Sequence, residues 1–267
     1  MERYQVIIAY DGTNFQGLQR QAESRTVQAE IEAALRQLGW QGSTILYAGR
    51  TDAGVHAAGQ VIAFDLDWAH SPDELRRALN DHLPHDVAAR DVRVARAGFH
   101  PRYDATARTY AYHLFCQPDR DPLRERYAWR VWPTVEGSLL FQASALLVGE
   151  HDFVTFGSTH RPQDATIRTV YGATWQQSGD LWTFRVTANA FLYRMVRRMV
   201  FLQVLVGQQR LTLDAFAAAL RSPTSPLTAG LAKPNGLVLE RVDYSEMIQI
   251  LEGSNETLLE SGDENSG

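Results

Sequence analysis

The alternation of apolar and polar residues predicts the same order of strands and helices in both halves of the chain. For the first half it predicts strands at residues 4–11, 43–49, 60–67 and 87–97, and helices at 26–39 and 71–83. Ser71 and Glu74 form a capping-box pattern that supports the second of these helices. For the second half it predicts strands at 103–116, 166–177, 181–189 and 236–243, and helices at 135–148, 191–207 and 212–221.

The order strand, helix, strand, strand, helix, strand is typical of the split βαβ unit. Two tandem units predict an α+β fold in which two ferredoxin-like antiparallel sheets meet around a central basic cleft. We therefore expect an N-terminal subdomain at residues 1–104 and a C-terminal subdomain at 105–246. Residues 247–267 are acidic and lack aromatic residues and periodicity, so we expect a disordered tail.

Composition narrows the class of protein. Hydrophobic residues make up 45% and charged residues 21% of the chain, which argues against a disordered protein or a coiled coil. The single cysteine, Cys116, excludes an intramolecular disulfide and fits a reducing cytoplasm. Arginines interrupt the most apolar long stretch, residues 191–207, so we expect no membrane-spanning segment. The spacing of the histidines does not suggest a metal site, and no glycine-rich phosphate loop follows a strand, so we expect no metal and no bound ATP or dinucleotide.

The charge distribution is uneven. The formal net charge is −5, from 31 acidic and 26 basic residues, and five of the acidic residues follow Ile250, so the remainder is balanced. Eight arginines lie between Arg161 and Arg221, and nine lie between Arg90 and Arg130. Arginine suits bidentate phosphate contacts and stacking on bases. Both stretches could bind nucleic acid, although composition alone favours an ordinary solvated surface.

The connection at residues 48–56 reads Ala-Gly-Arg-Thr-Asp-Ala-Gly-Val-His and places Asp52 between small residues, where a bulky substrate could reach it. A turn in which Asp52 bonds to its own backbone explains the same residues. If residues 191–207 are buried, Arg197 needs an acidic partner. Asp52 would satisfy it, and a structural ion pair with another acid is an equal alternative.

The strand at 103–116 combines arginine with aromatic residues. Arg108, Tyr110 and Tyr112 share one face because side chains alternate along a strand. Arginine beside aromatic rings can stack unpaired bases. The strand propensity of tyrosine is an alternative explanation for each residue taken singly.

These segments, in this order, closely resemble the tRNA pseudouridine synthase A family over nearly the whole chain up to about Tyr244. The matching segments are residues 10–12, 17–21, 48–56, 99–103, 105–110, 189–191 and 195–197. The resemblance implies an isomerase that converts uridine into pseudouridine at tRNA nucleotides 38, 39 and 40, in the anticodon stem-loop, without a cofactor or metal. It also implies a cytoplasmic homodimer that binds one tRNA across both subunits.

The resemblance assigns roles to individual residues. Asp52 matches the catalytic aspartate, Arg197 its arginine partner, Tyr110 the tyrosine that packs on the target base, and Arg50 an arginine that helps hold the flipped nucleotide. The residues expected to contact RNA are Arg20, His100, Arg102, Arg108 and Arg161. Leu18 and Phe201 stand where the family usually has tryptophan and glycine, so we expect altered packing near both positions.

Two other functions remain open at this point. A catalytically silent tRNA-binding protein on the same scaffold would bind RNA without using Asp52. A hydrolytic enzyme would need a second carboxylate, such as Asp152, within roughly 5–10 Å of Asp52. For the isomerase itself, Asp52 could stabilise or trap positive charge at C1′ or abstract a sugar proton, and the sequence does not choose between these routes.

Overall fold

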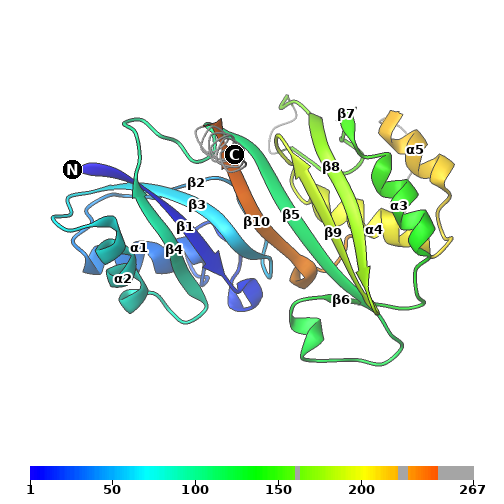
Figure 1. The fold of residues 1–267 in the computed structure, drawn as a ribbon, viewed down its shortest axis with the longest axis horizontal. Helices are drawn as coiled ribbons and strands as arrows, with labels where there is room; N and C mark the ends of the chain where they lie inside the picture. The colour runs from blue at the N-terminus through cyan, green and yellow to red at the C-terminus, as the bar shows by residue number, and fades with distance from the viewer. Residues whose placement is uncertain (160–162, 222–227, 246–267) are drawn as a thin grey trace, which may run out of the picture.

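The computed structural model describes residues 1–159, 163–221 and 228–245 (Figure 1). Within these residues the strands are β1 (Glu2–Tyr10), β2 (Leu46–Tyr47), β3 (His56–Leu66), β4 (Val87–Val94), β5 (Ala105–Cys116), β6 (Trp129–Val131), β7 (Gly149–Asp152), β8 (Ile167–Ser178), β9 (Leu181–Ala188) and β10 (Leu237–Tyr244). The α-helices are α1 (Val27–Gln37), α2 (Pro72–His82), α3 (Gly137–Ala145), α4 (Met195–Gly207) and α5 (Leu213–Arg221). Short 3₁₀ turns cover Gly12–Asn14, Arg124–Arg126 and Pro234–Gly236.

All the described strands join one continuous sheet. Its main order is β4-β1-β3-β10-β5-β9-β8-β7, with β2 added to β3 and β6 added to β5. Two pairings, β10 with β3 and β5 with β6, are parallel, and the others are antiparallel. The predicted α+β class is therefore confirmed. Strand β10 comes from the C-terminal end of the described chain and lies between β3 and β5, so it connects the two halves of the sheet (Figure 1).

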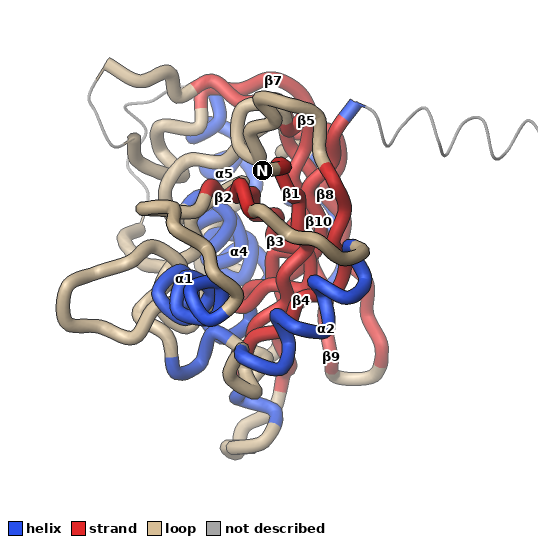
Figure 2. The backbone as a smooth tube through the Cα atoms, turned by 90° about the vertical axis from the view of Figure 1, so that its left-hand side faces the viewer, coloured by secondary structure: helices blue, strands red, loops and turns tan. Residues whose placement is uncertain are grey.

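The core is divided between the two halves of the sheet. In β1, alternate residues such as Tyr4, Val6 and Ile8 are buried in a cluster with α1 and α2, as a strand with one covered face requires. A second cluster lies under α3, α4 and α5, and Figure 2 shows α1, α4 and α5 on the same side of the sheet. Tyr110 of β5 packs against both clusters, so it marks the boundary between the halves.

Two predicted elements need correction, and two short strands were not predicted. The strand predicted at 43–49 is reduced to β2 because β2 and β10 share one edge of β3: β2 pairs with Ile62 and Ala63, and β10 pairs with His56 and Ala57. The helix predicted from residue 191 begins only at Met195, because Arg194 has a left-handed backbone. Strands β6 and β7 were not predicted, since three or four residues are too few for a clear alternation.

The capping box expected at Ser71 is present, with Glu74 reaching back to the Ser71 amide at 2.9 Å. In the part of the chain that the structure describes, no helix has both the length and the apolar character needed to cross a membrane. The acidic tail expected at 247–267 and the expected RNA contact Arg161 lie outside the described residues.

Buried tyrosines predict a loss of stability at alkaline pH. Burial raises the pKa of Tyr10 to about 12 and that of Tyr112 well above its usual value. Below pH 10 both phenols are protonated in the folded and the unfolded chain, so their titration does not affect stability. Above pH 10 the unfolded chain releases protons that the folded chain keeps. The free energy of unfolding should then fall by up to about 1.4 kcal/mol per tyrosine for each pH unit.

Urea denaturation at pH 8, 9, 10 and 11 measures this loss. The Tyr10→Phe variant should lose less stability than the wild type between pH 10 and 11, because one titrating group has been removed. The same loss in both proteins would show that Tyr10 is not responsible.

Candidate active site

The loop between β2 and β3 carries Asp52, and a second loop after β1 holds it in place. A side chain at Gly12 would collide with the carbonyl of Val55, and one at Gly17, whose φ is +93°, would lie 2.8 Å from the carbonyl oxygen of Thr51. Only glycine permits so close an approach of two backbones. The Leu18 amide also donates to the Thr51 carbonyl at 3.2 Å. The two loops are thus fixed against each other.

The support continues beneath the loop. The hydroxyls of Tyr10 and Thr51 are hydrogen-bonded at 2.7 Å, and both residues are buried. The Gly12 amide donates to Nδ1 of His56 at 3.0 Å, and burial lowers the pKa of His56. An imidazole that accepts at Nδ1 and has a lowered pKa is neutral near pH 7. Tyr10, Thr51 and a neutral His56 therefore support the Asp52 loop from below.

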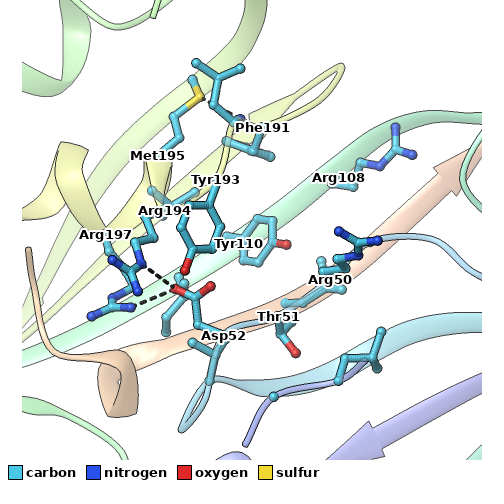
Figure 3. A pocket seen from close by; sticks show the side chains of 18 of the residues that line it. Arg50, Thr51, Asp52, Arg108, Tyr110, Phe191, Tyr193, Arg194, Met195 and Arg197 are labelled. Carbon is cyan, nitrogen blue, oxygen red and sulfur yellow. Dashed lines mark hydrogen bonds and ion pairs between the residues drawn. The ribbon is translucent and has the colours of Figure 1, made fainter. Parts of the chain in front are cut away.

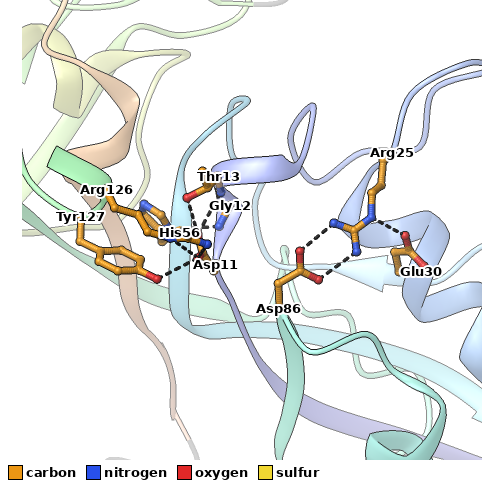
Figure 4. Close-up of polar contacts among 9 residues, drawn as sticks. All are labelled: Asp11, Gly12, Thr13, Arg25, Glu30, His56, Asp86, Arg126 and Tyr127. Atoms are coloured by element: carbon orange, nitrogen blue, oxygen red, sulfur yellow. Dashed lines mark hydrogen bonds and ion pairs between the residues drawn. The ribbon is translucent and has the colours of Figure 1, made fainter. Parts of the chain in front are cut away.

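Asp11, at the end of β1, ties this support to the C-terminal half (Figure 4). Its carboxylate accepts hydrogen bonds from Arg126 at 2.7 Å and from the Tyr127 hydroxyl at 2.9 Å. Burial alone would raise the pKa of Asp11, but hydrogen bonds from Thr13, Arg126 and Tyr127 outweigh it, and the net direction is downward. The charged form of Asp11 is therefore the one that the fold stabilises.

A neighbouring ion-pair cluster holds the start of α1. Arg25 donates to both carboxylate oxygens of Asp86, at 2.7 and 2.9 Å, and to Glu30 at 2.8 Å (Figure 4). Such a bidentate arrangement is geometrically specific. It connects the loop before α1 to the segment that leads into β4.

Asp52 forms the ion pair expected from the sequence. Its Oδ2 accepts a hydrogen bond from Nη1 of Arg197 at 2.7 Å, and the Nε of Arg194 lies 3.9 Å from the same oxygen (Figure 3). The side chains of Asp52 and Arg197 are 19% and 13% exposed. The Nε of Arg197 also donates to the Ala232 carbonyl at 2.9 Å. The Ala232 carbonyl therefore fixes the guanidinium of Arg197, and that guanidinium fixes the carboxylate of Asp52.

The pair lies in a cavity of about 810 Å³. The four residues expected at the active site, Arg50, Asp52, Tyr110 and Arg197, all line it, although they come from a loop, a strand and a helix far apart in the sequence. The Tyr110 ring meets the Phe191 ring edge to face, with centroids 5.1 Å apart. Burial raises the pKa of Tyr110, so its phenol is neutral at ordinary pH. The cavity thus combines charged groups with an aromatic wall (Figure 3).

The expected RNA contacts are distributed unevenly. Arg102 and Arg108 line the cavity. The guanidinium of Arg108 donates to backbone carbonyls, among them those of Arg102 at 2.6 Å and Asn189 at 2.8 Å, so it also joins the segments that surround the cavity.

Arg20 and His100 are not among the described residues that line the cavity. Arg20 pairs with the buried carboxylate of Glu32 at 2.5 Å. His100 accepts the Arg102 amide at 3.1 Å, and its ring lies 4.3 Å from that of Tyr103. If these two residues contact RNA, they do so outside the cavity.

The structure adds cavity residues to which the sequence gave no role. Tyr193, Arg194 and Arg168 also line the cavity. Tyr193 is held by a two-way backbone bridge with Ser158, at 2.9 and 3.3 Å. Arg168 and Arg194 belong to the arginine-rich stretch between Arg161 and Arg221, but the pattern of residues 191–207 predicted one continuous helix and gave Tyr193 no signal of its own.

Both departures from the family pattern are accommodated. Leu18 is buried beside the Asp52 loop. The ring of Phe201 lies against Gly230 and occupies the space that a side chain at position 230 would need. Leu18 and Phe201 are therefore both packed against neighbouring residues.

The carboxylate suggested for the hydrolase alternative, that of Asp152, is not part of the described cavity lining. Asp152 lies on β7, away from the described cavity lining, and its carboxylate accepts the Val154 amide at 3.1 Å. The acidic residues of the described lining are Asp52 and Asp164. Among the residues with described positions, no three histidine, cysteine, aspartate or glutamate side chains are grouped to hold a metal ion.

A carboxylate held by arginine, an aromatic wall and a lining rich in arginine are typical of an enzyme that acts on a nucleotide within an RNA strand. The chain belongs to the tRNA pseudouridine synthase family, whose sequence profile matches residues 6–104 and 143–245.

Curated relatives cover most of the chain. It is 37% identical over 251 residues to the tRNA pseudouridine synthase A of Agrobacterium fabrum, covering 93% of this chain and 94% of that one. It is 39% identical over 250 residues to the protein of the same name from Streptococcus equi subsp. equi, covering 92% and 100%. The namesake from Neisseria meningitidis serogroup B is 37% identical over 251 residues, covering 94% and 95%.

Proposed function

We propose that this protein isomerises uridine to pseudouridine at nucleotides 38, 39 and 40 of the tRNA anticodon stem-loop. Membership of the tRNA pseudouridine synthase family supports the reaction and the substrate class. The observation that carries the proposal is the Asp52–Arg197 pair in a cavity that also contains Tyr110 and Arg50. The three nucleotide positions rest on the family resemblance.

The reaction breaks the C1′–N1 bond, turns the base and joins C1′ to C5. C5 then loses its proton and N1 gains one, so the product is an isomer of the substrate, and a sugar proton taken up by Asp52 would have to be returned. Both arginine contacts of Asp52 fall on Oδ2. Oδ1 is therefore the oxygen proposed to meet the sugar, either to stabilise or trap positive charge at C1′ or to abstract a sugar proton. The pair with Arg197 keeps the carboxylate in one orientation, which is the condition for positioned catalysis. No protein group other than Asp52 needs to form a covalent bond in either route.

The target uridine must leave its stack to reach Asp52, which costs a few kcal/mol. The rings of Tyr110 and Phe191 offer an apolar surface against which the everted base can pack, worth about 1–3 kcal/mol for one stacked base. The same wall keeps water from the glycosidic carbon while the base is detached. Arg50, exposed on the cavity wall, is proposed to hold the flipped nucleotide.

We also propose the tandem domain organisation. In residues 1–104 the strands lie in the order β4-β1-β3-β2, and in residues 105–246 the corresponding order is β10-β5-β9-β8. Each half thus has the strand order of a split βαβ unit, with α1 and α2 in one and α3 and α4 in the other. The two stretches matched by the family profile agree with this division. The cavity then lies at the junction of two similar units.

The proposed function also implies an oligomeric state and a cellular location. We propose a homodimer in the cytoplasm that binds one tRNA across both subunits. The exposed apolar side chains of β8, Ile167 and Tyr171, are available for contact with a second copy. Sedimentation of the purified protein measures the mass directly, and a monomer at micromolar concentration would contradict the dimer.

The function is tested by incubating the pure protein with an unmodified tRNA transcript and mapping pseudouridine by carbodiimide labelling and primer extension. We expect stops at one or more of nucleotides 38 to 40, without ATP or added metal. Tight binding without stops would support a silent RNA-binding protein. Release of free uracil would indicate hydrolysis of the glycosidic bond instead.

A further inference from the structure

Arg194 has an unusual backbone at the edge of the cavity. Its φ is 62° and its ψ is 9°, in the left-handed region, immediately before α4. Among the described residues other than glycine, Arg194 and Gln209 have a positive φ. The conformation is disfavoured for an arginine and persists only where the surrounding structure enforces it. The Ser158–Tyr193 bridge on one side and α4 on the other provide that constraint.

The constraint places the Arg194 side chain in the cavity (Figure 3). Its guanidinium lies 4.6 Å from the centroid of the Tyr193 ring, and its Nε lies 3.9 Å from Oδ2 of Asp52. The latter distance is an ion-pair distance, too long for a hydrogen bond. The side chain is 47% exposed. The stack on Tyr193 fixes the direction of the guanidinium plane without using any of its N–H groups.

Other arginines of the described cavity lining already donate to protein groups. Arg168 donates to the carbonyls of Ala165 and Ile167. Arg197 donates to Asp52 and to the Ala232 carbonyl, and Arg108 donates to several backbone carbonyls. The guanidinium of Arg194, by contrast, donates no hydrogen bond to any residue that the structure describes; its contact with Asp52 is an ion pair at 3.9 Å. The guanidinium groups of Arg194 and Arg197 lie near the single carboxylate of Asp52, so the charge at this point of the cavity is positive on balance. Arg194 is therefore prepared for an anionic group that is not part of the protein.

We propose that Arg194 binds the phosphodiester next to the target nucleotide and thereby sets C1′ against Oδ1 of Asp52. The inference rests on the proposed function, because the anion is a phosphate of the RNA substrate. A planar guanidinium with several donors matches two phosphate oxygens at once. The positive end of the α4 dipole lies at the same place and favours the same charge.

The test compares Arg194→Gln with Arg76→Gln. Arg76 lies on α2 outside the cavity lining and pairs with Asp73, so its variant makes the same change in net charge. We expect Arg194→Gln to raise KM for tRNA by roughly 10-fold or more, with kcat changed less than KM. The slope of log kcat/KM against log salt concentration should become shallower by about 0.7–0.9, as for one lost phosphate contact. Arg76→Gln should match the wild type in both.

A second pair of variants separates function from folding. Arg194→Gly and Gln209→Gly both relieve a left-handed backbone, so both should keep or slightly raise Tm. Only Arg194→Gly should lose affinity for tRNA. A stable Arg194→Gly protein with wild-type KM and salt slope would overturn the inference.

The remaining outcomes are also decisive. A fall in kcat with unchanged KM and salt slope would mean that Arg194 acts on Asp52 and not on phosphate, which contradicts the proposal. Equal kinetics of Arg194→Gln and Arg76→Gln, with an active wild type, would refute this inference alone. A wild type that forms no pseudouridine would refute the proposed function, and the inference with it.

Discussion

Replacement of Asp52 by asparagine is expected to abolish pseudouridine formation, with kcat reduced by at least about 10⁴-fold. Asparagine has nearly the same shape and can still accept a hydrogen bond from Arg197, but it can neither carry the charge nor take up a proton at Oδ1. Because the surrounding loop is fixed by contacts of Gly12, Gly17 and Leu18, the fold should not change. Single-turnover assays on an unmodified tRNA transcript measure the rate.

The binding of tRNA should survive this change. We expect the Kd of Asp52→Asn to remain within about threefold of the wild type, since phosphate contacts supply most of the affinity for RNA. Asp91→Asn, which removes an exposed carboxylate of β4, is the matched control and should have normal activity. Asp52→Glu, which keeps the charge but displaces it, should still lose about 10²-fold. Turnover by Asp52→Asn would remove Asp52 from the chemistry.

Replacement of Arg197 by methionine is expected to lower kcat/KM by about 10²–10³-fold, the usual effect of losing one hydrogen-bond donor in an active site. Methionine fills a similar volume, but it leaves Oδ2 of Asp52 and the Ala232 carbonyl without their shared donor. The carboxylate would then lose its fixed orientation. The lost hydrogen bonds should also lower the free energy of unfolding by about 1–3 kcal/mol.

Arg198→Met is the matched control for this experiment. Arg198 follows Arg197 on α4 but is not among the residues that line the cavity. Its guanidinium donates to two backbone carbonyls, those of Thr228 and Gly230. The Arg198→Met variant should be less stable than the wild type. Under conditions in which it is folded, its activity should remain within about threefold of the wild-type activity. Steady-state kinetics and urea denaturation of both variants separate the two effects. Equal losses of activity in both would show that Arg197 acts only through folding.

Much of the fold follows from local patterns. Alternation along β5 correctly placed Arg108 and Tyr110 on one face, and both line the cavity. Local patterns cannot reveal that most donors of Arg108 are used by carbonyls, because those carbonyls belong to segments as distant as Asn189. The insertion of β10 beside β3 depends on a parallel pairing of two residues on each strand, which leaves no periodic signal.

The candidate site shows the same limit. The burial expected for residues 191–207 predicted that Arg197 needs an acidic partner. The pattern left another acid equally possible, and the family resemblance singled out Asp52. Arg194 was interpreted as part of a helix that includes residues 191–207, since arginine has no preference for a left-handed backbone. That conformation is imposed by the contact of Tyr193 with Ser158, 35 positions earlier in the chain. A functional residue whose position results from such long-range strain cannot be recognised from periodicity.

The position of β10 has a consequence for synthesis on the ribosome. Until this strand emerges, β3 and β5 both present an unpaired edge, and nascent chains with such edges are prone to associate wrongly. The Ala232 carbonyl that holds Arg197 is also translated just before this strand. A nascent polypeptide can therefore form much of its first half early, but it gains a working centre only after Ala232 and β10 have been translated.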